Sequence, residues 1–270
     1  MLGSERITFY DFRLFHQLLG IRHLASVEGS NSVEFQTRCE FNKPYHDLTL
    51  FLGLSTDYLK SANSDLNHLI WLDYDFGYGG ICHNDLATIL PRFKAGTIVI
   101  ITIDFERPDR RSAEILDELA EELPSDILHT VTANDMAAAN WRNTIIQLIE
   151  KSIALGLYGR SGSSGVTFLR LFSFEYRDTQ RMYTFGGMIV DPTIRKRIVR
   201  VARNWPFYCR DKLRNVKHIP HLIMTRKERN YLDRLALSST PYAGEIGVSV
   251  SDFQLYKEYY RYLPIYSEVL

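Results

Sequence analysis

The segment that decides the fold is a continuous apolar run, GTIVIITID, at Gly96–Asp104. A run rich in β-branched residues, without polar alternation, is typical of a strand that is covered on both faces in a parallel sheet. Upstream, HLIWLD at His68–Asp73 has the same character, and Asn84–Phe93 between the two has helical spacing. The order strand, helix, strand predicts a parallel sheet covered by helices.

The N-terminal part repeats this rhythm in a weaker form. Helices are expected at Thr8–Leu19 and Ser32–Phe41, and buried strands at His23–Glu28 and Leu48–Leu52. The second strand leads directly into Gly53. Because the first strand closes on an acid, we expect a carboxylate at the carboxyl end of that strand.

The pattern changes after a loop rich in glycine and serine, Gly159–Gly165. Two β-rich runs follow, Val166–Glu175 and Arg181–Val190, and their short connection predicts an antiparallel hairpin. Further helices are expected at Ser112–Leu123, Trp141–Leu155, Thr193–Arg203 and Thr225–Leu237, the last with a capping box at Thr225 and Glu228. The whole predicts an α/β fold: a mostly parallel sheet flanked by helices, with a C-terminal antiparallel hairpin and extra C-terminal helices.

We expect residues 1–192 to form the α/β domain and residues 193–270 to form a helical, basic and tyrosine-rich extension packed on it. The segment Thr193–Arg234 holds thirteen Lys or Arg against three Asp or Glu, although the net charge of the chain is zero. Such a block is either a solvated helical face or a surface that meets nucleic acid or an acidic protein partner.

Composition narrows the class of protein. The chain has 270 residues, of which 45% are hydrophobic and 24% charged, as in ordinary globular proteins. The longest apolar run is far shorter than the roughly 20 residues of a membrane helix. The three cysteines form no C-x-x-C pair. We therefore expect a cytoplasmic protein with reduced thiols, no membrane association and no metal site.

Four segments carry a resemblance to a known family. They are LGSERITFYDFRLFHQLLGIRHLASVE at 2–28, CEFNKP at 39–44, IWLDYDFGYGG at 70–80 and IPHLIMTRKERNYL at 219–232. Together with the parallel half that closes in a hairpin, they resemble an uncharacterised bacterial group of class I S-adenosylmethionine-dependent methyltransferases. The resemblance implies a Rossmann-like methyltransferase fold and S-adenosylmethionine as cofactor, and it leaves the methyl acceptor open.

The resemblance also implies cofactor-binding residues. Gly3 and Ser4 stand where such proteins have a glycine-rich turn, and Glu28 stands where a carboxylate accepts hydrogen bonds from the ribose hydroxyls. Leu54 and Ser55 would flank the adenine. The alternatives are that the Gly-Ser pair is an N-cap or an irregular start, and that Glu28 is a solvated loop acid.

Asp73, Tyr74 and Asp75 follow the strand whose end lies, by the same resemblance, beside the reacting methyl group. Asp73 would orient the acceptor, and Asp75 would act as a base or bind a cation. Alternatively, one carboxylate caps the next helix and the other is solvated. His83 beside Cys82 has no second cluster at ligand spacing, so it does not indicate a metal site.

The sequence departs from the family fold at one point. The first, central strand of that fold precedes the glycine turn, but only Met1 and Leu2 stand before Gly3. Either the chain begins late, or the central position is filled in another way, or the cofactor pocket is incomplete. Two hypotheses follow: a methyltransferase of unknown acceptor, or a non-catalytic subunit of a larger assembly with a nucleic-acid-binding basic face.

Overall fold

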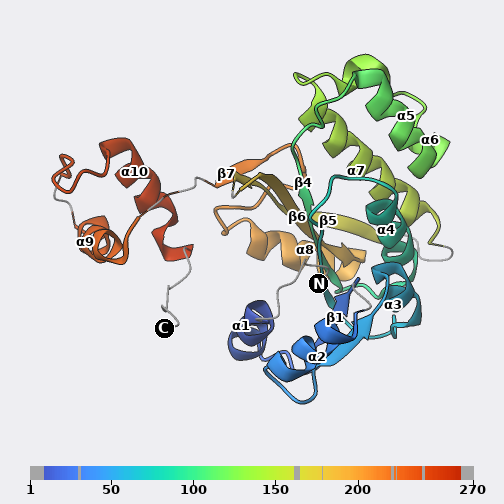
Figure 1. Ribbon diagram of the computed structural model, residues 1–270, viewed down its shortest axis with the longest axis horizontal. Coiled ribbons are helices and arrows are strands. Elements are labelled where there is room, and N and C mark those ends of the chain that lie inside the picture. The colour runs from blue at the N-terminus through green and yellow to red at the C-terminus, as the bar shows by residue number, and fades with distance from the viewer. Residues whose placement is uncertain are drawn as a thin grey trace. The chain divides into compact units, whose positions relative to one another are not determined.

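The computed structural model describes residues 9–29, 32–160, 165–177, 179–219, 222, 224–238 and 241–262. These form two compact units, Met1–His218 and Ile219–Leu270 (Figure 1). No helix in the described ranges combines the length and the apolar character that a membrane crossing requires. The division that the sequence predicts, between residues 192 and 193, stays a prediction.

The first unit begins with a small parallel sheet. Its elements are α1 (Tyr10–Leu19), β1 (Ala25–Glu28), α2 (Val33–Asn42), β2 (Thr49–Leu52) and α3 (Ser55–Ser61). β1 and β2 pair in parallel with Ala25 opposite Thr49 and Glu28 opposite Leu52. A cluster of buried side chains supports the pair: Phe9, Phe12, Leu24, Cys39 and Leu48. The helices and strands expected here from the sequence are confirmed, and α3 was not expected.

A larger sheet follows in the same unit, with the strand order β3-β4-β6-β5-β7. Its elements are β3 (Leu69–Asp73), α4 (Gly80–Arg92), β4 (Ile98–Asp104), α5 (Ser112–Glu122), α6 (Ser125–Leu128), η1 (Ala133–Met136), α7 (Trp141–Tyr158), β5 (Thr167–Arg177), β6 (Arg181–Val190), α8 (Pro192–Ala202) and β7 (Lys217–Ile219). β3 and β4 are parallel, whereas β6 is antiparallel to both β4 and β5. The predicted hairpin is confirmed.

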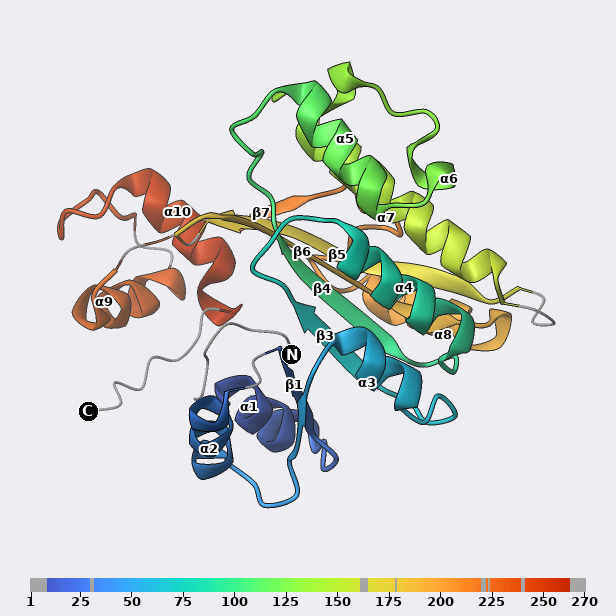
Figure 2. The ribbon, with the colours of Figure 1, turned by 45° about the vertical axis from the view of Figure 1, so that its right-hand side comes forward.

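Helices cover the larger sheet because its strands are apolar on both faces. α4 and α7 lie side by side along one face (Figure 2), and their residues Leu86, Ile89 and Ile149 are fully buried with Val99 and Ile101 of β4. On β5, Phe172 and Phe174 stack on each other and meet Trp205 at their edges. The α/β fold with helices flanking a sheet is confirmed.

The larger sheet is mixed because the expected hairpin joins it through β6. The difference from the expectation is that the described residues divide into a two-stranded and a five-stranded sheet. No strand in the described ranges lies between β1 and β3. The physical reason is that each of these strands has a hydrogen-bonded neighbour on one side only, so no ladder connects the two sheets.

The second unit is helical. It holds α9 (Arg226–Ala236), α10 (Val250–Tyr259) and η2 (Tyr260–Tyr262). Its core is a cluster of Leu232, Tyr242, Phe253 and Tyr256. The predicted capping box is confirmed, because Thr225 Oγ1 accepts from the Glu228 N–H while the Glu228 carboxylate accepts from the Thr225 N–H.

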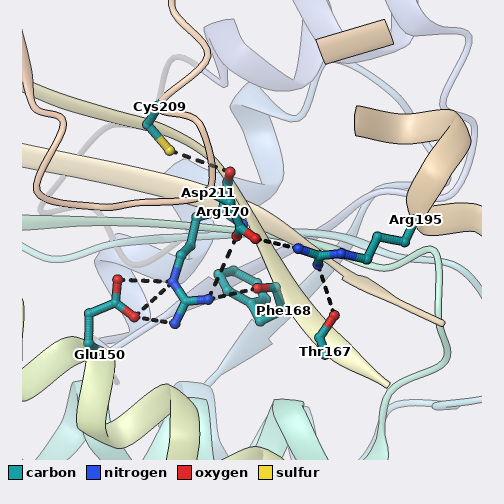
Figure 3. Close-up of polar contacts among 7 residues, drawn as sticks. All are labelled: Glu150, Thr167, Phe168, Arg170, Arg195, Cys209 and Asp211. Atoms are coloured by element: carbon teal, nitrogen blue, oxygen red, sulfur yellow. Dashed lines mark hydrogen bonds and ion pairs between the residues drawn. The ribbon is translucent and has the colours of Figure 1, made fainter. Parts of the chain in front are cut away.

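The basic region, Thr193–Arg234, spans both units, so its charges do not share one element. In the first unit Arg195 donates to the Asp211 carboxylate and to Thr167 Oγ1 (Figure 3). Asp211 Oδ1 also accepts from the backbone N–H of Arg170, whose guanidinium pairs with Glu150. Part of the basic charge therefore fastens the loop after α8 to β5 instead of facing solvent.

Candidate functional site

The candidate residues lie where β1, β2 and β3 end. Parallel pairing brings the ends of β1 and β2 to one edge, with Glu28 opposite Leu52. It likewise brings Asp73 of β3 opposite Thr102 of β4. Open parallel sheets bind ligands at the carboxyl ends of their strands. Gly3 and Ser4, expected beside this edge, lie outside the described residues.

Glu28 is a buried carboxylate. Its side chain is 8% exposed, and Ser26 Oγ donates to its Oε1 at 2.7 Å. Burial raises the pKa of Glu28, and the hydrogen bond from Ser26 opposes that rise. Oε2 has no hydrogen-bond partner among the described residues. The alternative interpretation of Glu28 as a solvated loop acid is therefore wrong.

Leu54 and Ser55 occupy the turn from β2 into α3. Leu54 is the N-cap residue of α3, and its side chain is 59% exposed. Ser55 is the first residue of the helix and is buried. The backbone therefore directs the apolar side chain outward at this edge and the hydroxyl inward.

The inward hydroxyls converge on a residue that the sequence analysis missed. Asp85, in the second turn of α4, is fully buried, and its carboxylate accepts hydrogen bonds from Ser55, Thr56 and Tyr74. A buried carboxylate needs such donors because it has lost its hydration. Asp85 thus ties the start of α3 and the residue after β3 to one helix.

A sequence signal for Asp85 exists. It falls between Cys82 and Ile89 on the stripe of α4 that faces the core, at the spacing where apolar residues are expected. An acid on an apolar stripe requires partners, and hydroxyl residues near the ends of neighbouring strands are the nearest source. The signal identifies the need for donors and does not identify which residues supply them.

The three predicted catalytic residues have different environments. Tyr74 is buried, and its hydroxyl is engaged with Asp85; burial, followed by the nearby Cys82 and Asp85, raises its pKa well above the ordinary value. Asp73 is half-buried at the end of β3, and Asp75 is exposed. Only the two aspartates are placed to meet a molecule from solvent.

The glycine-rich segment after Asp75 leads into the N-terminal end of α4. The helix begins at Gly80, four residues earlier than expected, because Glu122 Oε2 accepts from the Gly80 N–H at 2.8 Å. A Cβ at Gly79 would lie 2.3 Å from that same oxygen, so glycine is required for the carboxylate to reach the helix end. Tyr78 is buried in the core and is not at the surface.

A surface hollow of about 620 Å³ lies beside the ends of β3 and β4. Phe76 and Trp141 supply aromatic surface to it. The acids that line it are Asp104, Glu106, Glu118 and Glu122, and neither Lys nor Arg belongs to its described lining. The hollow is therefore a negatively charged entrance next to Asp75.

Packing in the interior accounts for His83 and for the three cysteines. His83 Nδ1 lies 3.0 Å from Ser152 Oγ, and burial lowers the pKa of His83. The three cysteines are buried and free, and burial raises the pKa of Cys82 to about 12. The described part of the chain holds no group of three or more His, Cys, Asp or Glu side chains arranged to bind a metal ion.

Comparison with protein-family models decides the family. Residues 2–270 match the model described as "Putative O-methyltransferase". The chain belongs to this family. The expected resemblance to methyltransferases is thereby confirmed over nearly the whole length, and the family's description adds oxygen as the methylated atom. No curated protein sequence matches the chain.

Solved structures with matching chains include methyltransferases and related enzymes. LepI, in complex with SAH and a substrate analogue, shares 10% identity at a TM-score of 0.37, with 70% of this chain and 41% of LepI covered. A 16S rRNA (adenine(1408)-N(1))-methyltransferase from Catenulisporales acidiphilia shares 11% at 0.36, with 68% and 83% covered. PigF with SAH shares 14% at 0.30, with 68% and 48% covered. The chain therefore spans about two fifths of the LepI chain.

Proposed function

We propose that the chain transfers a methyl group from S-adenosylmethionine to an oxygen atom of an acceptor, with Glu28 holding the ribose of the cofactor. The observation that carries this proposal is the buried Glu28 carboxylate, which keeps one oxygen without a partner among the described residues at the end of a parallel strand. Membership of the O-methyltransferase family supports the reaction class.

The chemistry of the donor set fits this cofactor. The Oε2 atom of Glu28 is an acceptor for ribose hydroxyls, and the exposed Leu54 side chain offers an apolar surface for an adenine ring. When bound, the cofactor would supply an electrophilic methyl group on a positively charged sulfur. The residues of the chain then have to align the acceptor and remove its proton.

We assign these tasks to the two aspartates. Asp73, at the end of β3, would accept a hydrogen bond from the acceptor hydroxyl and orient it. Asp75 is exposed and would receive the proton. Tyr74 lies between them and points inward to Asp85, which fixes the backbone from which both aspartates project. We therefore assign Tyr74 a positioning role.

The acid-lined hollow beside Asp75 supports a neutral or cationic acceptor. Glu118 pairs with Arg110, but Asp104, Glu106 and Glu122 leave the hollow acidic, which disfavours phosphate groups. Phe76 and Trp141 give flat apolar surface to an organic molecule. A nucleic-acid acceptor would have to approach from elsewhere, and a role of Thr193–Arg234 in binding a partner stays a prediction.

Equilibrium dialysis with radiolabelled S-adenosylmethionine tests the assignment of Glu28. Glu28→Gln keeps the shape of the side chain but removes the charge, and we expect at least about 10-fold weaker binding, the value of a charge-assisted hydrogen bond. Glu34→Gln, an exposed glutamate in the first turn of α2, is the matched control. Equal binding by the two variants would refute the ribose assignment.

A further inference from the structure

The end of α8 and the loop that follows it form a second hollow in the surface of the first unit. Its volume is about 540 Å³, and the described residues that line it are Val199, Arg203, Trp205, Pro206, Tyr208 and Arg210. Two of these residues are arginines and two are large aromatic residues, while neither Asp nor Glu belongs to this described lining. We call it the basic hollow, because its charge is opposite to that of the acid-lined hollow beside Asp75.

β5 supports the aromatic side of the basic hollow. Phe172 and Phe174 of β5, together with Phe207, meet the Trp205 ring nearly at right angles, with centroids 5.6 to 6.3 Å apart. Trp205 and Tyr208 are nevertheless only half-buried, so both keep surface toward the hollow. Packing of this kind holds a flat ring in one position, as a platform for stacking requires.

The backbone at Arg210 is fixed on both sides. Before it, the Cys209 N–H donates to the Leu171 carbonyl at 3.0 Å, and after it, Asp211 Oδ1 accepts from the Arg170 N–H at 2.9 Å. Arg210 and Asp211 have φ values of +55° and +59°. Residues other than glycine rarely adopt this conformation, and those that do cluster at ligand sites. The contacts drawn around Asp211 in Figure 3 therefore hold the segment that presents Arg210 to the basic hollow.

Neighbouring acids do not neutralise the basic hollow. Asp211 is the one acid in the sequence between residues 193 and 218, and it pairs with Arg195 and Arg170. The side chains of Arg203 and Arg210 are exposed, and their guanidinium groups have no hydrogen-bond or ion-pair partner among the described residues. Both arginines are therefore available to bind an anion, and a planar guanidinium suits a phosphate group.

One face of α8 extends the positive charge beyond the basic hollow. Lys196, Val199, Arg200 and Arg203 recur at intervals of three and four residues, the spacing of neighbours on one helix face. Val199 and Arg203 line the hollow, so the exposed Lys196 and Arg200 lie along the same face. At the rise of an α-helix, Lys196 and Arg203 are about 10 Å apart along the axis. Three cations thus form a row that leads into the hollow.

We propose that the basic hollow and this row of cations bind a single-stranded nucleic acid, with one unpaired base beside Trp205 and Tyr208 and the phosphates on the exposed cations around them. The cations concerned are Lys196, Arg200, Arg203 and Arg210.

This ligand uses both properties of the surface. An unpaired base offers a flat face for stacking on aromatic rings, and the phosphates of a strand offer anions at regular intervals. A duplex keeps its bases stacked in its interior, and an acidic peptide matches the charge but not the aromatic surface. The assignment does not depend on methyl transfer, because none of these residues belongs to the proposed cofactor or acceptor site.

Fluorescence anisotropy with the full chain and a labelled oligouridylate of about twelve nucleotides tests the binding. For four phosphate contacts on a single strand, we expect the logarithm of the binding constant to fall with the logarithm of the salt concentration at a slope of about −3. The double variant Arg203→Ala with Arg210→Ala should bind at least about 10-fold more weakly and show about half that slope. The matched control is Arg13→Ala with Arg38→Ala, which removes the same charge from exposed positions of α1 and α2 and should leave both values unchanged.

Ultraviolet cross-linking of the oligouridylate to the unmodified chain, followed by mass spectrometry of the peptides, locates the base. We expect cross-links at Trp205 or Tyr208. This measurement needs no variant, so it decides the place of binding even where a variant fails to fold.

Several results would overturn the proposal. Absence of binding at low salt would remove the site, and so would equal binding by the two double variants or cross-links confined to residues outside the basic hollow. Equally tight binding of the matched duplex would exclude the contact with an unpaired base. Competition by uridine monophosphate at the same nucleotide concentration would reassign the hollow to a free nucleotide, and competition by polyglutamate at the same charge concentration would reassign it to an acidic protein partner.

Discussion

The small sheet and the large sheet of the first unit differ in how much of the chain holds them. Among the described residues, β1 and β2 are supported by a cluster of five buried side chains, whereas thirty pack in the cluster around β3, β4 and β6. Yet Glu28 and Leu54, which we propose hold the cofactor, belong to the small sheet or follow it directly, whereas the Ser55 hydroxyl is engaged with Asp85. Ligand-binding elements are commonly drawn from the less stable part of a fold, and the proposed cofactor site would follow that rule.

The largest expected effect is on stability, and it differs between the larger and the smaller buried cluster. Leu90→Ala in α4 removes a fully buried side chain from the larger cluster, and we expect a loss of about 3 to 5 kcal/mol in the free energy of unfolding. Leu48→Ala in the smaller cluster should cost about 2 kcal/mol, because fewer neighbours surround the space that it leaves. Urea denaturation measures both variants, and a larger loss for Leu48→Ala would reverse the comparison.

The second effect concerns the residue that joins the two regions. Asp85→Ala leaves the hydroxyls of Ser55, Thr56 and Tyr74 without their acceptor in the core, and we expect a loss of about 3 kcal/mol. Asp85→Asn keeps one acceptor oxygen and should lose less. Asp117→Ala, at an exposed position of α5, is the control. Thermal unfolding is the measurement, and similar melting temperatures for the two alanine variants would show that Asp85 does not join these elements.

The third prediction is that stability and cofactor binding both depend on pH through Glu28 of the small sheet. The folded chain holds the Glu28 proton at pH values where the unfolded chain has released it, since burial raises the pKa of Glu28 in the fold. The stability from this group is complete below the unfolded pKa and is lost as pH rises through the folded pKa. Ribose binding needs the ionised form, so acidification from neutrality toward the unfolded pKa of a glutamate should weaken cofactor binding while this group favours the folded state.

Calorimetric titrations across that range check the sign. Glu28→Gln should remove both trends, because it cannot ionise. Cofactor binding by the parent chain that strengthens on acidification would contradict the assigned role.

The smallest expected effect on stability is at the N-terminal end of α2, the helix between the two strands of the small sheet. Ser32 Oγ accepts from the Phe35 N–H at 3.0 Å and caps α2. Ser32→Ala should cost about 1 kcal/mol in the free energy of unfolding and leave the larger cluster intact. Hydrogen exchange resolves this: faster exchange confined to α2 is expected, and faster exchange throughout α4 would show that the two regions are not separable.

Elements with an apolar run or a capping signal could be predicted from the sequence, and short elements without either could not. β4 has a continuous apolar run and loses only two residues at its start, and β6, a run of ten residues that are mostly buried, matches its expected range. α3 has seven residues with little apolar periodicity, and β7 has three. Such elements form because neighbouring parts of the chain pack on them, and a local pattern does not contain that information.

The candidate site likewise contains positions that could be predicted from the sequence and contacts that could not. The positions of Glu28 and Asp73 at strand ends follow from the order of strands and helices, so they could be predicted. The contact between Ser55 and Asp85 joins residues 30 positions apart and depends on how α3 packs on α4. The inward direction of Tyr74 likewise follows from burial in three dimensions and has no local signal.

Hydrogen exchange of the full chain with and without S-adenosylmethionine tests the central claim most directly, because it reports both binding and its place. We expect slower exchange at the ends of β1, β2 and β3, around Glu28, Ser55 and Asp75, with no change in the hairpin of β5 and β6. An unchanged exchange pattern at saturating cofactor, or protection confined to the hairpin, would contradict the account.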